Sequence, residues 1–178
     1  KTMPNPGNGI TDGNPLYWLE KNFRRNEVNR ITGNASLKYD IIKDLYVKVS
    51  GNIYLYEAIN ESFTKATQTY SQIFANPQVF NTTRPATWSQ NRTVQQQYNA
   101  IINYTKRIGN NHNINAMLGA ETFGQKSLNS QVSGSGAPTD DIPTVNASTI
   151  FNAGSNFSSK SEYRIISHFG RINYDYDQ

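Results

Sequence analysis

Strict two-residue alternation over long stretches is the feature that most constrains how this chain can fold. Between Arg30 and Ile41, apolar or small side chains occupy the odd positions and polar side chains the even positions. Successive side chains of a β-strand point to opposite faces, so this period predicts a strand with one apolar and one polar face. The full set of alternating segments is 30–41, 45–56, 93–104, 113–123 and 161–176. No helical period persists, and the sequence predicts an all-β fold.

Composition supports extended structure. Hydrophobic residues make up 36% of the 178 residues and charged residues 17%, both low for a chain with a large core. Asparagine, serine, threonine and glutamine fill the difference, and there are 11 tyrosines. These residue types favour strands and polar loops over helices.

Charge and cysteine content exclude several functions. The chain has no cysteine, which excludes disulfides and cysteine-ligated metals. A net charge of +4 would suit nucleic acid, but only Lys21, Arg24 and Arg25 lie close together in sequence. Nucleic-acid binding usually requires a basic patch, so we expect no nucleic-acid partner.

The lengths of the alternating runs indicate a membrane barrel. Strands of soluble domains average about 5–6 residues, whereas tilted transmembrane strands need about 9–11. Short breaks near Lys43 and Gly109 alternate with long polar loops at 57–91 and 124–160, as periplasmic turns alternate with extracellular loops. Residues 17–23 would form a sixth, short strand. The sequence predicts an antiparallel, up-and-down segment of about five to six strands from a large transmembrane β-barrel.

Tyrosines near the predicted short turns fit the same interpretation. Their positions are Tyr39, Tyr104, Tyr174 and Tyr176. Membrane barrels carry girdles of aromatic residues where the apolar band meets water. Five or six strands cannot close a barrel, and open sheet edges do not occur in lipid. We therefore expect the chain to be part of a longer polypeptide.

Five stretches occur in order along most of the chain. They are Asn14-Pro-Leu-Tyr-Trp-Leu-Glu-Lys-Asn22, residues 29–45, Asn111-His-Asn-Ile-Asn-Ala-Met-Leu-Gly-Ala-Glu121, Pro138-Thr-Asp-Asp-Ile-Pro-Thr-Val-Asn146 and Gly170-Arg-Ile-Asn-Tyr-Asp-Tyr176. Together they resemble the barrel domain of SusC/RagA-type TonB-dependent outer-membrane transporters of Bacteroidetes. The resemblance implies residues 1–178 to be part of a 22-stranded barrel, with the plug and N-terminal domains of the family absent from them.

The resemblance also implies partners and a location. The whole transporter would lie in the outer membrane lipid of a Gram-negative cell. It would import oligosaccharides or peptides with a SusD-like surface lipoprotein, driven through its plug by the TonB-ExbB-ExbD complex. The alternative hypothesis is a soluble β-sandwich that acts as a binding or adhesin module.

No constellation of residues suggests an enzyme. His112 and His168 lie on different predicted strands, with no carboxylate at ligand spacing. We expect no catalytic residue, no cofactor and no metal site.

The predicted outer loops hold the candidate contacts with ligand or partner. Their aromatic members are Tyr70, Phe74, Phe80 and Trp88. Such rings stack on sugars and anchor interfaces, although they also pack loops together. Asp140 and Asp141 could help to bind a cation, and turn formation is the alternative for both.

Overall fold

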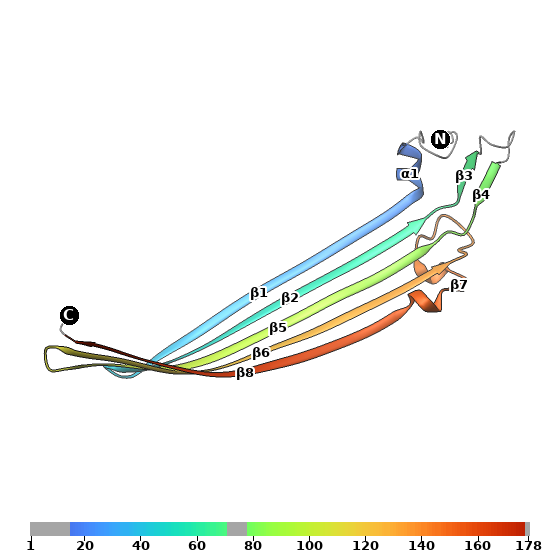
Figure 1. The fold of residues 1–178 in the computed structure, drawn as a ribbon. Coiled ribbons are helices and arrows are strands. Elements are labelled where there is room, and N and C mark those ends of the chain that lie inside the picture. Colours follow the sequence, from blue (N-terminus) through green and yellow to red (C-terminus); the bar gives the residue numbers. More distant parts are fainter. Residues whose placement is uncertain (1–14, 71–77, 177–178) are drawn as a thin grey trace. The chain divides into compact units, whose positions relative to one another are not determined.

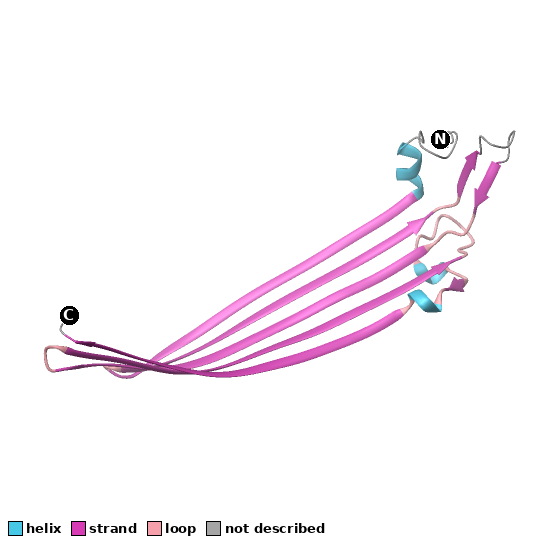
Figure 2. Cartoon of the chain, in the orientation of Figure 1, coloured by secondary structure: helices cyan, strands magenta, loops and turns pink. Residues whose placement is uncertain are grey.

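A computed structural model describes residues 15–70 and 78–176, in which long strands dominate (Figures 1 and 2). The long strands are β1 (Asn22–Ile42), β2 (Leu45–Thr64), β5 (Ala86–Ile108), β6 (His112–Ser135) and β8 (Phe157–Tyr176). They form one sheet in the order β1-β2-β5-β6, with β8 and the short β7 (Ile150–Phe151) both paired with β6. The predicted all-β, antiparallel fold is confirmed.

The remaining described elements are short. Strands β3 (Thr67–Tyr70) and β4 (Gln78–Asn81) form a separate antiparallel pair. Two single-turn 3-10 helices, Val145–Ala147 and Ala153–Ser155, flank β7. One helix, α1 (Pro15–Lys21), precedes β1. None of the helices in the described ranges has the length and apolar character needed to cross a membrane.

The prediction of a strand at residues 17–23 was wrong. Pro15 occupies the first position of α1, where its missing N–H costs nothing and its fixed φ suits a helix. The first long strand begins only at Asn22. The run from Tyr17 is too short for its two-residue alternation to outweigh this helix start.

The chain divides into two compact units. The first contains the described residues of 1–28, 57–91 and 128–159, and the second those of 29–56, 92–127 and 160–178. The second unit holds the predicted turns. Gly109 has a φ of +63°, a left-handed conformation that glycine adopts without strain. Lys106 Nζ lies 2.7 Å from Asp44 Oδ2 and so links the two turns.

The second unit separates apolar from polar side chains as predicted. Its polar face consists of even positions on β1 and β2 and odd positions on β5, β6 and β8. The Ser50 hydroxyl donates to Asn99 Oδ1, and Gln95 Nε2 donates to Gln125 Oε1 at 2.8 Å across this face. Its apolar face carries the opposite positions, where a Cβ added to Gly51 would lie 3.1 Å from the Tyr98 ring.

The apolar face of the second unit is uncovered. Leu37 is 74% exposed, Leu118 69% and Ile172 77%. A soluble sandwich would bury such side chains against a second sheet about 10 Å away. None of the described residues does so, and those among them that are apolar and buried lie in the first unit.

The first unit has a small core. Phe63, Ala86 and Ala137 are each at most 2% exposed, and Val145 and Ala147 pack against them. Phe63 lies near the end of β2 and Ala86 begins β5. This core therefore joins the ends of strands to the connection that follows β6.

Both long loops are shorter than predicted. The predicted loop 57–91 includes the end of β2 and the start of β5, which leaves 65–85, and the predicted loop 124–160 shrinks to 136–156. The strands continue through polar sequence because backbone pairing does not require apolar side chains. Here both faces are polar, as in the contact between Thr87 Oγ1 and Ser133 Oγ at 3.1 Å, so alternation no longer marks the strand.

Candidate functional site

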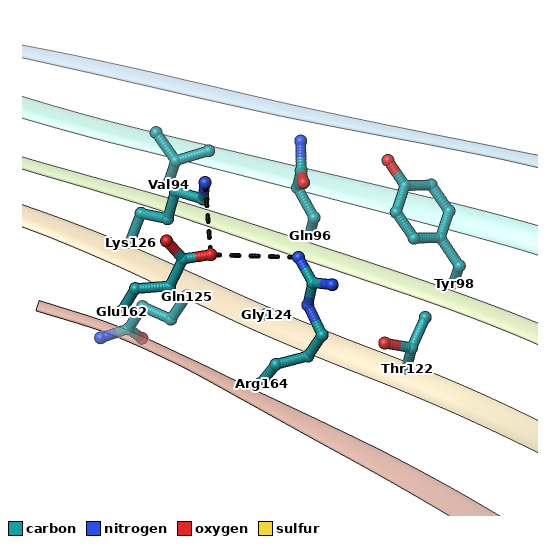
Figure 3. Close-up of a pocket in the computed structure, with 9 residues that line it drawn as sticks. All are labelled: Val94, Gln96, Tyr98, Thr122, Gly124, Gln125, Lys126, Glu162 and Arg164. Carbon is teal, nitrogen blue, oxygen red and sulfur yellow. Dashed lines mark ion pairs between the residues drawn. The ribbon is translucent and has the colours of Figure 1, made fainter.

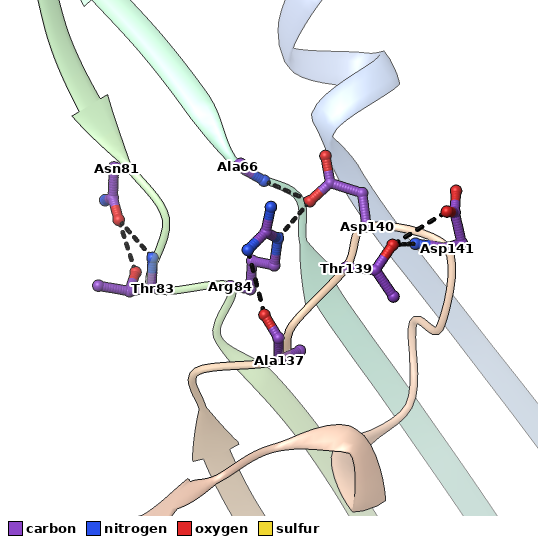
Figure 4. Close-up of polar contacts among 8 residues, drawn as sticks. All are labelled: Ala66, Asn81, Thr83, Arg84, Ala137, Thr139, Asp140 and Asp141. Atoms are coloured by element: carbon purple, nitrogen blue, oxygen red, sulfur yellow. Dashed lines mark hydrogen bonds and ion pairs between the residues drawn. The ribbon is translucent and has the colours of Figure 1, made fainter.

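An ion pair between Arg84 and Asp140 joins the two long connections of the first unit, 65–85 and 136–156 (Figure 4). Asp140 Oδ1 accepts hydrogen bonds from the Ala66 backbone N–H at 2.9 Å and from Arg84 Nε. Arg84 Nη1 also donates to the Ala137 carbonyl at 3.1 Å. Arg84 has a φ of 44°, a left-handed conformation that is costly for a residue with a side chain. These contacts hold the backbone in that conformation.

The electrostatics of Asp140 suit a structural anion. Burial by itself raises the pKa of the carboxyl group. The hydrogen bond from Ala66 and the hydrogen bond and charge of Arg84 outweigh burial, so the pKa of Asp140 lies below its usual range. The carboxylate is therefore charged and already partnered within the chain.

The two neighbouring aspartates do not converge on one point. Asp141 is exposed, and its Oδ2 accepts a hydrogen bond from Thr139 Oγ1 at 2.9 Å. The Asp141 N–H donates back to the same hydroxyl at 3.2 Å, which closes a local turn. Throughout the described part of the chain, no three His, Asp or Glu residues are grouped to hold a metal. A function of Asp140 or Asp141 in ligand contact stays a prediction.

The candidate aromatic residues lie on three elements. Tyr70 ends β3 and pairs with Gln78, Phe80 on β4 is 63% exposed, and Trp88 on β5 is half-buried. Phe74 and the Tyr70 side chain lie outside the described residues. Of the two whose side chains are described, neither Phe80 nor Trp88 belongs to the core around Phe63. Contact of any of the four with a ligand or partner stays a prediction.

A pocket of about 480 Å³ lies on the apolar face of the second unit, beside strands β5, β6 and β8 (Figure 3). Glu162 Oε1 lies 3.2 Å from Lys126 Nζ and 3.9 Å from Arg164 Nη2, so one carboxylate bridges two cations. The other lining residues are Val94, Gln96, Tyr98, Thr122, Gly124 and Gln125. Sequence reasoning missed this site because it placed Lys126 in a loop. The sequence signal that could have indicated it is the run of charged residues at alternate positions, Lys160, Glu162 and Arg164, which a strand places on one face.

Because Asp140 binds both Arg84 and Ala66, we expect the structural stability of the two connections to depend on this residue. We call these contacts the anchor. Replacing Asp140 with Asn should reduce protection of their backbone amides by roughly 1–2 kcal/mol, because Arg84 and Ala66 lose a charged acceptor. Hydrogen–deuterium exchange of 65–85 and 136–156 measures the effect, with exposed Asp141→Asn as the matched control.

The same anchor predicts a pH dependence. A depressed pKa contributes stability that is present above the unfolded value, about 3.9, and is lost as the pH falls through the lower folded value. The protection factors of 65–85 and 136–156, which are corrected for the pH dependence of intrinsic exchange, should therefore fall below about pH 4 in the wild type and change less in Asp140→Asn. Equal acid responses in the two proteins would show that Asp140 is not the anchor.

Comparison with known proteins adds a likeness of fold. No protein-family model and no curated protein sequence matches the chain. The solved structure of the RagAB peptide transporter is similar to it, with a TM-score of 0.76 and 18% identity over 95% of this chain. RagAB in its open-open and closed-closed states gives TM-scores of 0.76 and 0.75, each at 18% identity over 96% of this chain. The chain spans 18% of the length of these RagAB chains.

Proposed function

We propose that this chain is part of the barrel wall of a SusC/RagA-type outer-membrane transporter that imports nutrients. The long antiparallel strands, the alternation of short turns with long connections, and the likeness in fold to RagAB chains support the proposal. The polar face of the second unit would then line the lumen, and its apolar face would contact lipid.

The observation that carries the proposal is the length of the uncovered apolar face. Apolar and small side chains occupy alternate positions along 31–41 of β1, 45–55 of β2 and 94–104 of β5, interrupted by Gln96. Each stretch spans 11 residues, and a tilted strand needs about 9–11 to cross a bilayer. Below, we call the apolar face of the second unit over this length the apolar band.

The outer edge of the apolar band is staggered as strand tilt requires. Lys126 lies opposite Glu162, and the pairing of Gln95 with Gln125 places Val94 opposite Lys126. On β5, β6 and β8, the first charged residues on this face away from the turns are Arg92, Lys126 and Arg164, offset by two residues from one strand to the next.

Transmembrane strands tilt by about 35–45°. With a spacing of about 4.8 Å between strands and a rise of about 3.3 Å per residue, that tilt requires roughly 1–1.5 residues of offset per strand. Residues on one face of a strand are two positions apart, so the offset between charged residues on that face can only be an even number. The observed offset of two residues is therefore consistent with the required tilt.

The nutrient and the partners follow from the same proposal. The similar RagAB structures are those of a peptide transporter. Peptides are therefore the first substrate class to test and oligosaccharides the second, with a SusD-like lipoprotein over the long connections. Import would use the TonB-ExbB-ExbD complex acting on a plug encoded elsewhere in the polypeptide. Deleting the gene should abolish growth on one of these two nutrient classes and spare the other.

A gel experiment tests the barrel itself. We expect the polypeptide that contains residues 29–41 to be found in the outer-membrane fraction. It should be larger than the 20.1 kDa of this chain and migrate differently before and after boiling in detergent. A soluble band of about 20 kDa that is indifferent to boiling would overturn the proposal and favour a soluble binding module.

Thiol labelling tests which face is wet. This chain has no native cysteine, and Lys48 and Val49 are neighbours on opposite faces of β2. A water-soluble thiol reagent should label Lys48→Cys in intact outer membranes and should not label Val49→Cys. Val49 is 49% exposed in the structure, so only a covering lipid would protect a cysteine at this position. Equal labelling of both would mean that no lipid covers the apolar face.

A further inference from the structure

We propose that the pocket around Lys126 and Arg164 binds the phosphate-bearing headgroup of a lipid in the outer leaflet. This inference rests on the proposed function and adds a specific ligand site to it. The two cations and Tyr98 lie along one pocket, with Glu162 between the cations (Figure 3).

Basic residues gather at this edge of the apolar face. Lys126 and Arg164 line the pocket, and Arg92 and Lys160 each lie two residues along a strand from a lining residue, on the same face. All four are exposed. Glu162 is the one acidic residue among the described positions of the apolar face from Arg92 to Tyr104, His112 to Lys126 and Lys160 to Tyr176. The cluster therefore has a net charge of +3 and attracts an anion.

Position distinguishes this cluster from an ordinary solvated surface. On the side toward the turns, β6 presents Leu118 and β8 presents Ile166 and Ile172, each at least 68% exposed. A lipid whose acyl chains cover these side chains must place its headgroup at the end of the apolar band. Lys126 and Arg164 lie at this end of the band. Their charged groups can therefore contact the phosphate and remain outside the hydrocarbon.

The pocket has the size and the lining for a headgroup. Its volume of about 480 Å³ falls within the range of small-molecule sites, roughly 300–1,000 Å³. Lys126 and Arg164 supply N–H donors for charge-assisted hydrogen bonds to phosphate oxygens. Val94 and the half-exposed ring of Tyr98, which both belong to the apolar band, offer apolar contact. Free phosphate would use the cations and leave this apolar contact unused.

Glu162 competes with the phosphate for the same cations. Its carboxylate lies within 4 Å of both, so a bound headgroup must share or displace it. Removing the carboxylate should therefore strengthen anion binding. If the three charges served only to hold β6 to β8, removing Glu162 would weaken the sheet and would not favour any lipid.

The test uses the whole outer-membrane polypeptide purified in a zwitterionic detergent. Short-chain phosphatidylglycerol is the anionic probe and short-chain phosphatidylcholine the neutral one, with binding followed by calorimetry. The variants are the double substitution K126Q/R164Q, E162Q and the control R171Q. Arg171 is an exposed cation on β8 that lies on the polar face.

We expect phosphatidylglycerol to bind more tightly than phosphatidylcholine. Each cation near an anionic lipid surface contributes roughly fivefold in affinity, so K126Q/R164Q should weaken phosphatidylglycerol binding roughly 30-fold. E162Q should strengthen it roughly fivefold, and R171Q should leave it unchanged.

Three results would overturn the inference. They are equal affinity for the two lipids, undiminished binding of phosphatidylglycerol by K126Q/R164Q, and full competition by inorganic phosphate, which would indicate a free-anion site. Each leaves the proposed barrel intact as long as the polypeptide remains heat-modifiable in the outer membrane. Loss of that property in the wild type would instead reject the proposed function.

Discussion

Replacing Leu37 with arginine is expected to destabilise the proposed barrel by about 2–4 kcal/mol, the cost of a cation on a lipid-facing surface near the bilayer midplane. Leu37 lies near the middle of the apolar stretch 31–41 of β1 and is 74% exposed. In lipid, its neighbours are acyl chains that cannot solvate a guanidinium group. The measurement is the temperature at which the full polypeptide loses the heat-modifiable form expected of a closed barrel.

Ser36→Arg is the matched control for this substitution. Ser36 is the preceding residue of β1 and points to the polar face, where it lines a pocket of about 270 Å³ with Lys48, Ser50 and Asn99. A water-filled lumen would solvate the new side chain, so we expect a change within about 0.5 kcal/mol. In a soluble protein both residues would face water, and a neutral Leu37→Arg would argue against the membrane barrel.

Truncating Phe63 should have the second large effect, on the first unit. Phe63 is 1% exposed and contacts the core to which the 3-10 helix Val145–Ala147 contributes. Replacing a buried phenylalanine with alanine costs about 3–5 kcal/mol, because apolar contacts are lost and a cavity remains. In so small a core the helix should separate, and a protease should cut 136–156 much faster than in the wild type.

Phe80→Ala is the control for the Phe63 prediction. Phe80 lies on β4, is 63% exposed and does not belong to the core, so its truncation should leave the cleavage rate unchanged. If Phe80→Ala reduced nutrient uptake without changing cleavage, its predicted contact with ligand or partner would gain support. Equal cleavage of Phe63→Ala and the wild type would show that the core does not hold the connection.

Local pattern was enough to predict most of the strands of the second unit. Alternation in 30–41 and 45–56 specified both the strands and the side to which each residue points, because a shift of one residue would exchange the apolar and polar faces. Gly109 marked its turn through the backbone freedom that only glycine has. The two site features were harder, because neither Asp140 with Arg84 nor Lys126 with Glu162 is close in sequence.

The sequence by itself therefore determined the all-β class, the facing of the strands and the positions of the short turns, since each depends on neighbours along the chain. Only the tertiary structure decided how far β2, β5, β6 and β8 extend, because beyond the apolar band both faces are polar and alternation disappears while backbone pairing continues. Only the structure also shows that Asp140 accepts hydrogen bonds from Arg84 and Ala66, and that Glu162 lies between two cations. Asp140 is 56 and 74 residues away from Arg84 and Ala66, and Lys126 is 36 residues away from Glu162; such contacts depend on sheet register and loop closure, which no local pattern encodes.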